Sequence, residues 1–236
     1  YWPKDETNNK LSFFAYYPYT IEAANLAIGA VGTGNTITYT VKDTPATQEN
    51  LMIADYVKNL TYTNSDNGSV NFTFSHMLTR VRFQFALSSA VDAKTTVAVN
   101  SASISNIFKK GVLQVAETAA ASNWTPSEKT NYTIPVPAGN ITTTLPASFS
   151  NTNELFLLLP QTLADDAMLN IKYTVSSEGS SPVVNNQNVR LKDIKVGSTP
   201  LTEWNKKQNI VYTIKIGVGE HPISFKASVT DWESEE

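Results

Sequence analysis

Few residues in this chain of 236 amino acids have side chains suited to catalysis or metal binding. Cysteine is absent, and the two histidines are His76 and His221. A general base or a metal ligand needs partners at defined spacing, and neither histidine has a second histidine, a cysteine or a carboxylate pair near it in sequence. We interpret His76 as a hydrogen-bonded structural residue at a strand junction. The sequence therefore predicts no metal site.

Two polar segments resemble known kinds of site, and in both we favour an ordinary turn. Asp165 and Asp166 could form the carboxylate pair of a glycoside hydrolase, but adjacent residues on a strand or turn point apart. Residues 64–69 have the composition of a calcium loop, but Ser75 stands near the position where an EF-hand places its bidentate glutamate.

The chain contains no G-x-S-x-G motif, no glycine-rich phosphate loop and no H-E-x-x-H motif. We therefore predict no catalytic residue and no cofactor, and a chain that is not an enzyme. A hydrolase whose carboxylates lie far apart in sequence is the remaining catalytic alternative.

Composition predicts an all-β protein. Hydrophobic residues make up 41% of the chain and charged residues only 17%, and serine, threonine and asparagine fill the difference. This mixture suits sheets with threonine-rich outer faces, whereas exposed helices need more Glu, Lys, Leu and Ala. The chain is long enough for one large β domain or two smaller ones.

Charge and hydropathy exclude two classes of partner. The net charge is -3, so the chain lacks the basic surface that supplies most non-specific affinity for nucleic acid. No apolar stretch approaches the roughly 20 residues that span a bilayer. The chain opens at Tyr1 without a methionine or a signal segment, which we interpret as a processed or trimmed form.

Apolar residues between Val70 and Leu87 change parity, which predicts a break in the strand. They are even-numbered up to Leu78 and odd-numbered from Val81 onwards. Because side chains alternate between the faces of a strand, one regular strand cannot bury both sets. We expect a junction at residues 77–80, with the strand from Val70 in one sheet system and residues 81–87 in another.

Other strand patterns are short and separated by turn signals, which is typical of antiparallel sandwiches. The Asn67-Gly68 pair predicts a hairpin in which the strand from Val70 pairs with residues 59–63. An alanine-rich segment at residues 20–30 predicts a helical turn. Strands are expected at residues 11–17, 36–41, 94–99, 102–108, 111–116, 131–136, 154–159, 168–176, 187–196, 208–218 and 221–230.

Several segments together resemble the fimbrillin family, the subunits of Bacteroidetes type V surface pili. They occur in the family's order and cover nearly the whole chain. The matching segments are Tyr1-Trp2-Pro3, Leu11 to Tyr19, Asn50 to Ala54, Val70 to Phe85, Leu157 to Gln161, Trp204 to Ile216 and Val229 to Trp232.

The resemblance implies two tandem transthyretin-like β-sandwich domains, which we place at residues 1–77 and 78–236. It also implies lipoprotein export to the outer membrane of a Gram-negative bacterium and assembly of fimbriae by strand exchange with other pilus subunits. The family's lipid-anchoring cysteine is not in this chain, and its first strand is missing, so contact with a membrane would require an anchor outside it.

The residues themselves indicate one candidate donor strand and one candidate contact for a receptor. Near the C-terminus, Ile223, Phe225, Ala227 and Val229 share one face of a strand, which could fill a neighbour's groove or remain in its own subunit. Trp124, which we expect in a loop at residues 118–130, is the best candidate contact for a host glycan because sugar faces stack on aromatic rings. The alternative function is a surface lipoprotein that binds glycan or protein and never polymerises.

Overall fold

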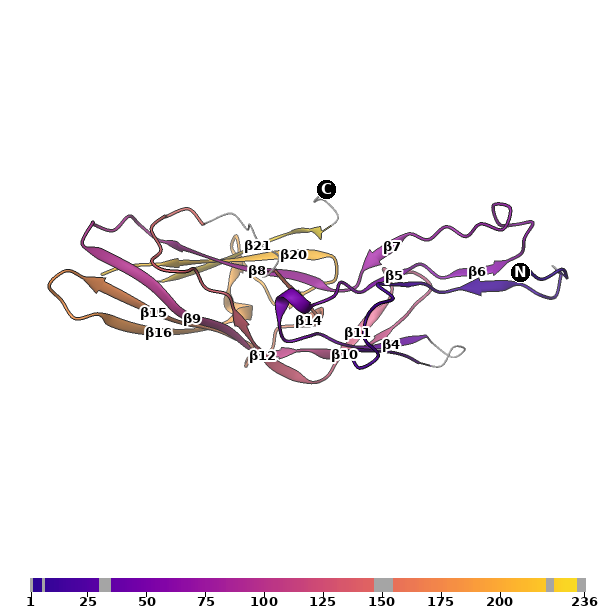
Figure 1. The fold of residues 1–236 in the computed structure, drawn as a ribbon, viewed down its shortest axis with the longest axis horizontal. Coiled ribbons are helices and arrows are strands. Elements are labelled where there is room, and N and C mark those ends of the chain that lie inside the picture. Colours follow the sequence, from indigo (N-terminus) through magenta and orange to yellow (C-terminus); the bar gives the residue numbers. More distant parts are fainter. Residues whose placement is uncertain (1, 6, 30–34, 147–154, 220–222, 233–236) are drawn as a thin grey trace.

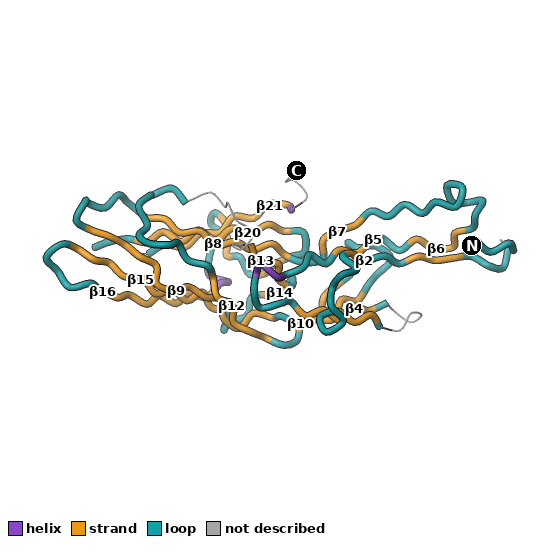
Figure 2. Tube along the Cα trace, viewed as in Figure 1, coloured by secondary structure: helices purple, strands orange, loops and turns teal. Residues whose placement is uncertain are grey.

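The protein is an elongated all-β molecule (Figure 1). The computed structural model describes residues 2–5, 7–29, 35–146, 155–219 and 223–232. Strands run along most of its length, and loops lie mainly at the ends and over the surface (Figure 2). The β15–β16 hairpin lies at one end of the long axis and β6 lies near the other, with β21 ending close to the middle (Figure 1). The expected all-β class is confirmed.

Two sheets form the larger body of the molecule, a six-stranded sheet in the order β13-β8-β20-β21-β17-β18 and a four-stranded sheet in the order β12-β9-β15-β16. The strands of the first are β8 (Thr79–Leu87), β13 (Leu155–Leu158), β17 (Lys195–Val196), β18 (Thr199–Pro200), β20 (Gln208–Ile216) and β21 (Ser224–Asp231). Those of the second are β9 (Thr95–Phe108), β12 (Lys129–Ile134), β15 (Met168–Ser177) and β16 (Val183–Arg190).

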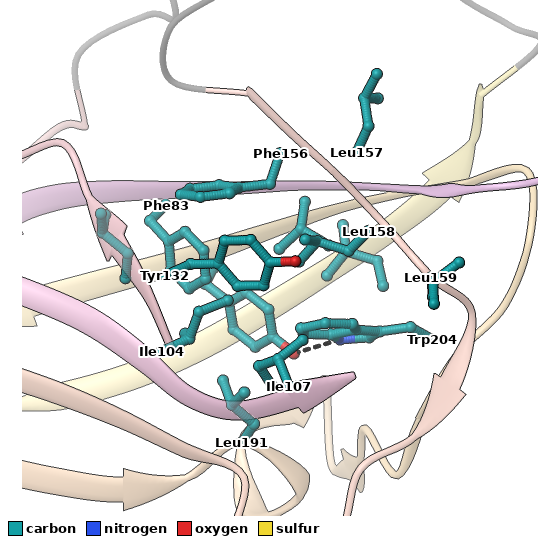
Figure 3. Packing of buried hydrophobic residues seen from close by; sticks show 14 of the residues in the cluster. Phe83, Ile104, Ile107, Tyr132, Phe156, Leu157, Leu158, Leu159, Leu191 and Trp204 are labelled. Atoms are coloured by element: carbon teal, nitrogen blue, oxygen red, sulfur yellow. Dashed lines mark hydrogen bonds between the residues drawn. The ribbon is translucent and has the colours of Figure 1, made fainter. Parts of the chain in front are cut away.

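Aromatic side chains pack between these two sheets (Figure 3). Phe83 stacks on Tyr212 with ring centroids 5.2 Å apart, and Phe156 meets both Phe83 and Tyr132 edge-on at 5.9 Å. Alternate residues of β8 and β20 point into this core because the side-chain period of a strand is two.

Antiparallel pairing was expected throughout, but two pairs of strands are parallel. β8 and β20 run parallel over eight paired positions, and β17 pairs with β21 in parallel, whereas the other pairs are antiparallel. Parallel neighbours need a long connection between them, and more than 100 residues separate β8 from β20. The two-domain transthyretin-like arrangement stays a prediction.

Among the described residues, four smaller sheets and the 3-10 helices η1 and η3 accompany the two main sheets. The sheets have the orders β2-β5-β7, β1-β6, β11-β10-β4-β3 and β14-β19. The elements are β1 (Leu11–Phe13), β2 (Tyr16–Tyr17), β3 (Leu26–Ile28), β4 (Thr36–Thr40), β5 (Met52–Ala54), β6 (Val57–Leu60), β7 (Phe74–His76), β10 (Lys110–Gln114), β11 (Asn123–Pro126), β14 (Gln161–Thr162), β19 (Glu203–Trp204), and the 3-10 helices η1 (Pro45–Thr47) and η3 (Leu191–Asp193).

The predicted strand break lies at Met77 and Leu78. β7 ends at His76 and pairs with β5, whereas β8 begins at Thr79 and pairs with β13 and β20. Met77 and Leu78 are fully buried, so the two apolar sets meet where the chain passes from one sheet to another. The assignment of the two segments to different sheets is confirmed, although residues 70–73 lie outside every strand.

The predicted hairpin around Asn67-Gly68 is wrong. Both residues do have positive φ, at 47° and 85°, and they close a tight turn in which Ser69 donates to the carbonyl of Asp66. However, β6 pairs with β1, and β7 pairs with β5. A turn signal specifies local backbone geometry, whereas the strands that leave the turn take whichever partners the tertiary fold provides.

The N-terminal third forms the sheets β1-β6 and β2-β5-β7 by itself, but its strands β3 and β4 join a sheet with later strands. β4 pairs with β10 over five positions, so the sheet β11-β10-β4-β3 contains strands from both sides of the boundary expected between residues 77 and 78. The helical turn expected at residues 20–30 is a single turn at residues 22–26, in which Leu26 N–H donates to the Glu22 carbonyl, and β3 follows it. The domain boundary stays a prediction, and the sheet pairing crosses it.

Candidate functional site

The adjacent acids Asp165 and Asp166 contact different lysines. Asp166 forms an ion pair with Lys129 at 2.9 Å, and Asp165 pairs with Lys192. The hydrogen bond from Lys192 lowers the pKa of Asp165 below its ordinary value. The two carboxylates thus join a turn to separate elements, and they do not converge on a shared site as a glycosidase pair would.

His76 lies at the strand junction, as expected, and connects it to the C-terminal strand. Its ring stacks on Trp232 at 4.0 Å with an interplanar angle of 4°, and its Nδ1 lies 2.8 Å from the Asn50 amide nitrogen. Arg80 lies over the same indole, 5.7 Å from its centroid. These contacts attach the end of β21 to the break between β7 and β8. His221 lies outside the described residues.

Residues 64–69, the calcium-loop candidate, use their polar groups to close turns. The side-chain oxygen of Asn64 accepts from the backbone N–H of Thr61, and Ser65 Oγ accepts from Gly68 N–H. Within the described part of the chain, no group of three or more His, Asp or Glu residues is placed to hold a metal ion.

The candidate donor strand is β21, and its faces divide as predicted. Ala227 is 8% exposed, and Ile223, Phe225 and Val229 are half-buried, while the residues between them are exposed. β21 lies in its own subunit's sheet, paired with β20 over eight positions. Its outer edge pairs with β17 at only two positions. Exchange of this strand stays a prediction.

A groove of about 570 Å³ runs beside β21, between the two main sheets, and both apolar and amide side chains line it. β16, at the edge of its sheet, lines the other side, and Val183 and Val184 at its start are 58% and 53% exposed. The apolar lining comes from Tyr173, Val175, Val189, Val218, Ile223 and Phe225.

Trp124, the candidate glycan contact, lies on strand β11 and not in a loop. Its ring is half-buried, and its indole N–H donates to the Met77 carbonyl at 2.7 Å. The ring lines an open cavity of about 360 Å³ beside β14 and β19, which we call the Trp124 cavity. The polar residues Asn123, Thr162, Glu203 and Asn205 also line it. The sequence does not identify these four because they come from three segments far apart in the chain.

The sheet of β1 and β6 has only two strands, and both of its outer edges lack a strand partner within the described residues. Its apolar residues Leu11, Phe13 and Leu60 are only half-buried. Trp2 packs against Phe13 at 5.9 Å and donates its indole N–H to the Gly68 carbonyl at 3.2 Å. A two-stranded sheet is marginally stable by itself, so this end of the molecule has an incomplete sheet.

A family model described as fimbrillin-like matches residues 1–232. The chain belongs to the fimbrillin-like family. The fold agrees: a fimbrial protein from Bacteroides vulgatus superposes with a TM-score of 0.72 at 18% identity, with 98% of this chain and 79% of that one covered. A candidate cell adhesion protein from Bacteroides uniformis superposes with a TM-score of 0.55 at 22% identity, with 98% and 76% covered. No curated protein matches the chain in sequence.

Membership in the fimbrillin-like family indicates a fimbrial or adhesin subunit at the cell surface. The family resemblance predicted from the residue motifs is confirmed. Among the described residues, no helix has the length and apolar character needed to cross a membrane.

Proposed function

We propose that this fimbrillin-like chain is a structural or accessory adhesin subunit of fimbriae on a Gram-negative outer membrane, that it assembles by strand exchange, and that it is not an enzyme. The main support for strand exchange comes from the structure of β21. This strand has one apolar face, it lies near the C-terminus, and its outer edge is paired at only two positions. Such a strand can pair with a neighbour in the same way that it pairs with β20.

The two-stranded β1–β6 sheet is the surface that would accept the donated strand. An added strand would hydrogen-bond to an open edge and cover the half-buried Leu11, Phe13 and Leu60. Association through two different surfaces is heterologous, so repetition along the chain of subunits gives a filament instead of a closed dimer. Attachment to the outer membrane would be through a lipid anchor.

A disulfide that locks β21 to β20 tests the exchange directly. Val211 and Ser228 are directly opposite on these strands, and both point away from the core. Cross-strand residues at such positions have Cβ atoms close enough for a disulfide. Because the chain has no other cysteine, the variant Val211→Cys/Ser228→Cys forms one defined bond. We expect filaments under reducing conditions and monomers after oxidation, measured by light scattering and electron microscopy.

The control lock joins β15 to β16, through Lys172→Cys/Asn186→Cys at an exposed cross-strand pair. This variant should assemble in both redox states because that hairpin takes no part in the proposed exchange. Assembly of the oxidised β20–β21 variant would refute the donor role of β21.

The alternative is a surface lipoprotein that binds glycan or protein and does not polymerise. The Trp124 cavity favours it, since an accessible aromatic ring with polar neighbours is typical of ligand sites. This alternative predicts that the protein, with β21 unlocked, stays monomeric at high concentration in either redox state.

A further inference from the structure

Strands from distant parts of the chain form the Trp124 cavity. β11 belongs to the sheet that includes β4, whereas β14 and β19 pair with each other beside the main core. The cavity volume of about 360 Å³ lies at the lower end of the range for small-molecule sites, roughly 300–1,000 Å³. It is open to solvent, so it suits a ligand that remains partly exposed, such as one unit of a longer chain.

The aromatic wall of the cavity is held rigidly. Trp124 donates its N–H to Met77, and Trp204, which is 1% exposed, donates its N–H to Tyr212 Oη at 2.9 Å. A Cβ at position 111 would lie 3.2 Å from Trp124 Cε3, so Gly111 lets the indole lie directly against the β10 backbone. With both N–H groups bonded inside the protein, Trp124 offers a ligand only its apolar ring surface.

The polar rim of the cavity offers several hydrogen-bond acceptors to a ligand. The Asn205 amide group donates to Glu203 at 3.0 Å, and the Asn123 amide group donates to the Ala121 carbonyl at 3.0 Å. Each amide group therefore uses one of its two N–H donors inside the protein. The amide oxygens of Asn123 and Asn205 and the carboxylate of Glu203 remain as acceptors.

A cation on the rim could add a preference for acidic ligands, but the lysine next to Asn205 does not serve this purpose. Lys206 Nζ donates to the carbonyls of Ala119, Ala120 and Ser122 at 2.6–2.8 Å, which uses all three of its donors. Glu203 therefore gives the rim a negative charge. An anionic ligand would meet this carboxylate directly, whereas no lysine or arginine is among the described residues that line the cavity.

We propose that the Trp124 cavity binds a neutral hexopyranose unit of a glycan. A pyranose has an apolar C–H face, which stacks on the Trp124 ring, and several hydroxyl donors, which match the acceptors of Glu203, Asn205 and Asn123. This inference rests on the adhesin role proposed above and names its ligand class. Its test uses monomeric protein, so a negative result would leave the assembly of the fimbria untouched.

Saturation-transfer NMR with three methyl glycosides tests the site: methyl β-D-galactopyranoside, methyl β-D-glucopyranoside and methyl α-D-mannopyranoside. Single-sugar contacts of this kind have dissociation constants on the order of 1 mM, which this method detects. We expect transfer to the ring C–H protons of at least one glycoside. The double variant Glu203→Ala/Asn205→Ala should weaken that binding about tenfold or more, since it removes two hydrogen-bond acceptors.

Matched controls separate the site from general effects. Glu178→Ala removes another exposed carboxylate, from the turn between β15 and β16, and it should leave sugar binding unchanged. Trp124→Phe keeps an aromatic ring of smaller area and should weaken binding, with an unfolding curve to check that the fold persists. Lack of transfer to all three glycosides, or unchanged binding by the double variant, would overturn the proposal. Stronger binding of N-acetylneuraminic acid or trimethyllysine than of any glycoside would overturn it as well.

Discussion

At the residue scale, the core tyrosines differ in how their hydroxyl groups are satisfied. Tyr212 accepts a hydrogen bond from Trp204, and Tyr39 donates to the carbonyl of Glu49 at 2.8 Å. The hydroxyl of Tyr132 is buried and has no hydrogen-bond partner among the described residues. Removing a hydroxyl should therefore have a cost that depends on the partner left behind, because an unsatisfied buried donor loses its hydration without compensation.

We predict that Tyr212→Phe lowers the free energy of unfolding by about 1–3 kcal/mol, because the buried Trp204 N–H loses its acceptor. Tyr132→Phe is the matched control, and its free energy of unfolding should be nearly unchanged or slightly higher. Urea unfolding of the two variants measures the difference. Equal destabilisation of both would show that the Trp204–Tyr212 hydrogen bond does not stabilise the core.

At the element scale, the same sequence signal has two structural outcomes. The parity change at residues 77–80 coincides with a break between β7 and β8. In β9 the buried residues Val99 and Ala102 also differ in parity, yet the strand continues, because the register with β15 shifts near Asn100. A bulge absorbs one extra residue where both partner strands continue, and a break forms where the next partner belongs to another sheet.

A second feature at the element scale is the edge strand β16, which lacks the lysine or proline residues that commonly prevent edge strands from pairing with other molecules. It has eight residues, and none from Val183 to Val189 is a lysine or a proline. We predict that Val184→Lys slows aggregation on mild heating, measured by light scattering, while it changes the unfolding free energy by less than about 0.5 kcal/mol. Val112→Lys, on β10 with partners on both sides, should leave the aggregation rate unchanged.

At the scale of the whole molecule, one continuous set of buried residues extends from Ile21 to Ala227. Residues on both sides of position 77 contribute to it, and Tyr56 N–H donates to the carbonyl of Glu117 across the expected boundary. Shared sheets and a shared core favour unfolding in one cooperative step, even if the chain contains two sandwich units.

Alkaline titration tests this cooperativity. Burial raises the pKa of Tyr39, Tyr132 and Tyr212 well above the ordinary value of 10.0, with Glu49 adding to the shift of Tyr39. Below the unfolded pKa these phenols are neutral in both states, so stability does not depend on them. As the pH rises above about 10, only the unfolded state ionises, and each tyrosine removes about 1.4 kcal/mol of stability per pH unit.

We expect the tyrosinate absorbance of all three residues to appear together with loss of the β-sheet circular dichroism signal, in a single step. Replacement of Tyr39 by Phe would identify its share of the absorbance. If Tyr39 ionised at a lower pH than Tyr212, the N-terminal region would unfold separately, which would support a domain boundary near residue 77.

The sequence by itself determined the local properties of this protein. Composition and alternation specified the all-β class, the apolar face of β21 and the break near Met77, because side-chain periodicity depends only on neighbouring residues. The family could be inferred from ordered motifs such as the segment from Val70 to Phe85.

Only the tertiary structure decided which strands pair and which side chains meet. Backbone hydrogen bonds are alike for any partner, so the sequence did not show that β8 runs parallel to β20 or that the Asn67-Gly68 turn joins strands of different sheets. For the same reason, Trp124 was the only residue of the Trp124 cavity that the sequence analysis identified. Asn123 and Glu203 are 80 residues apart, and only the packing of β11 against β14 and β19 brings them to one site.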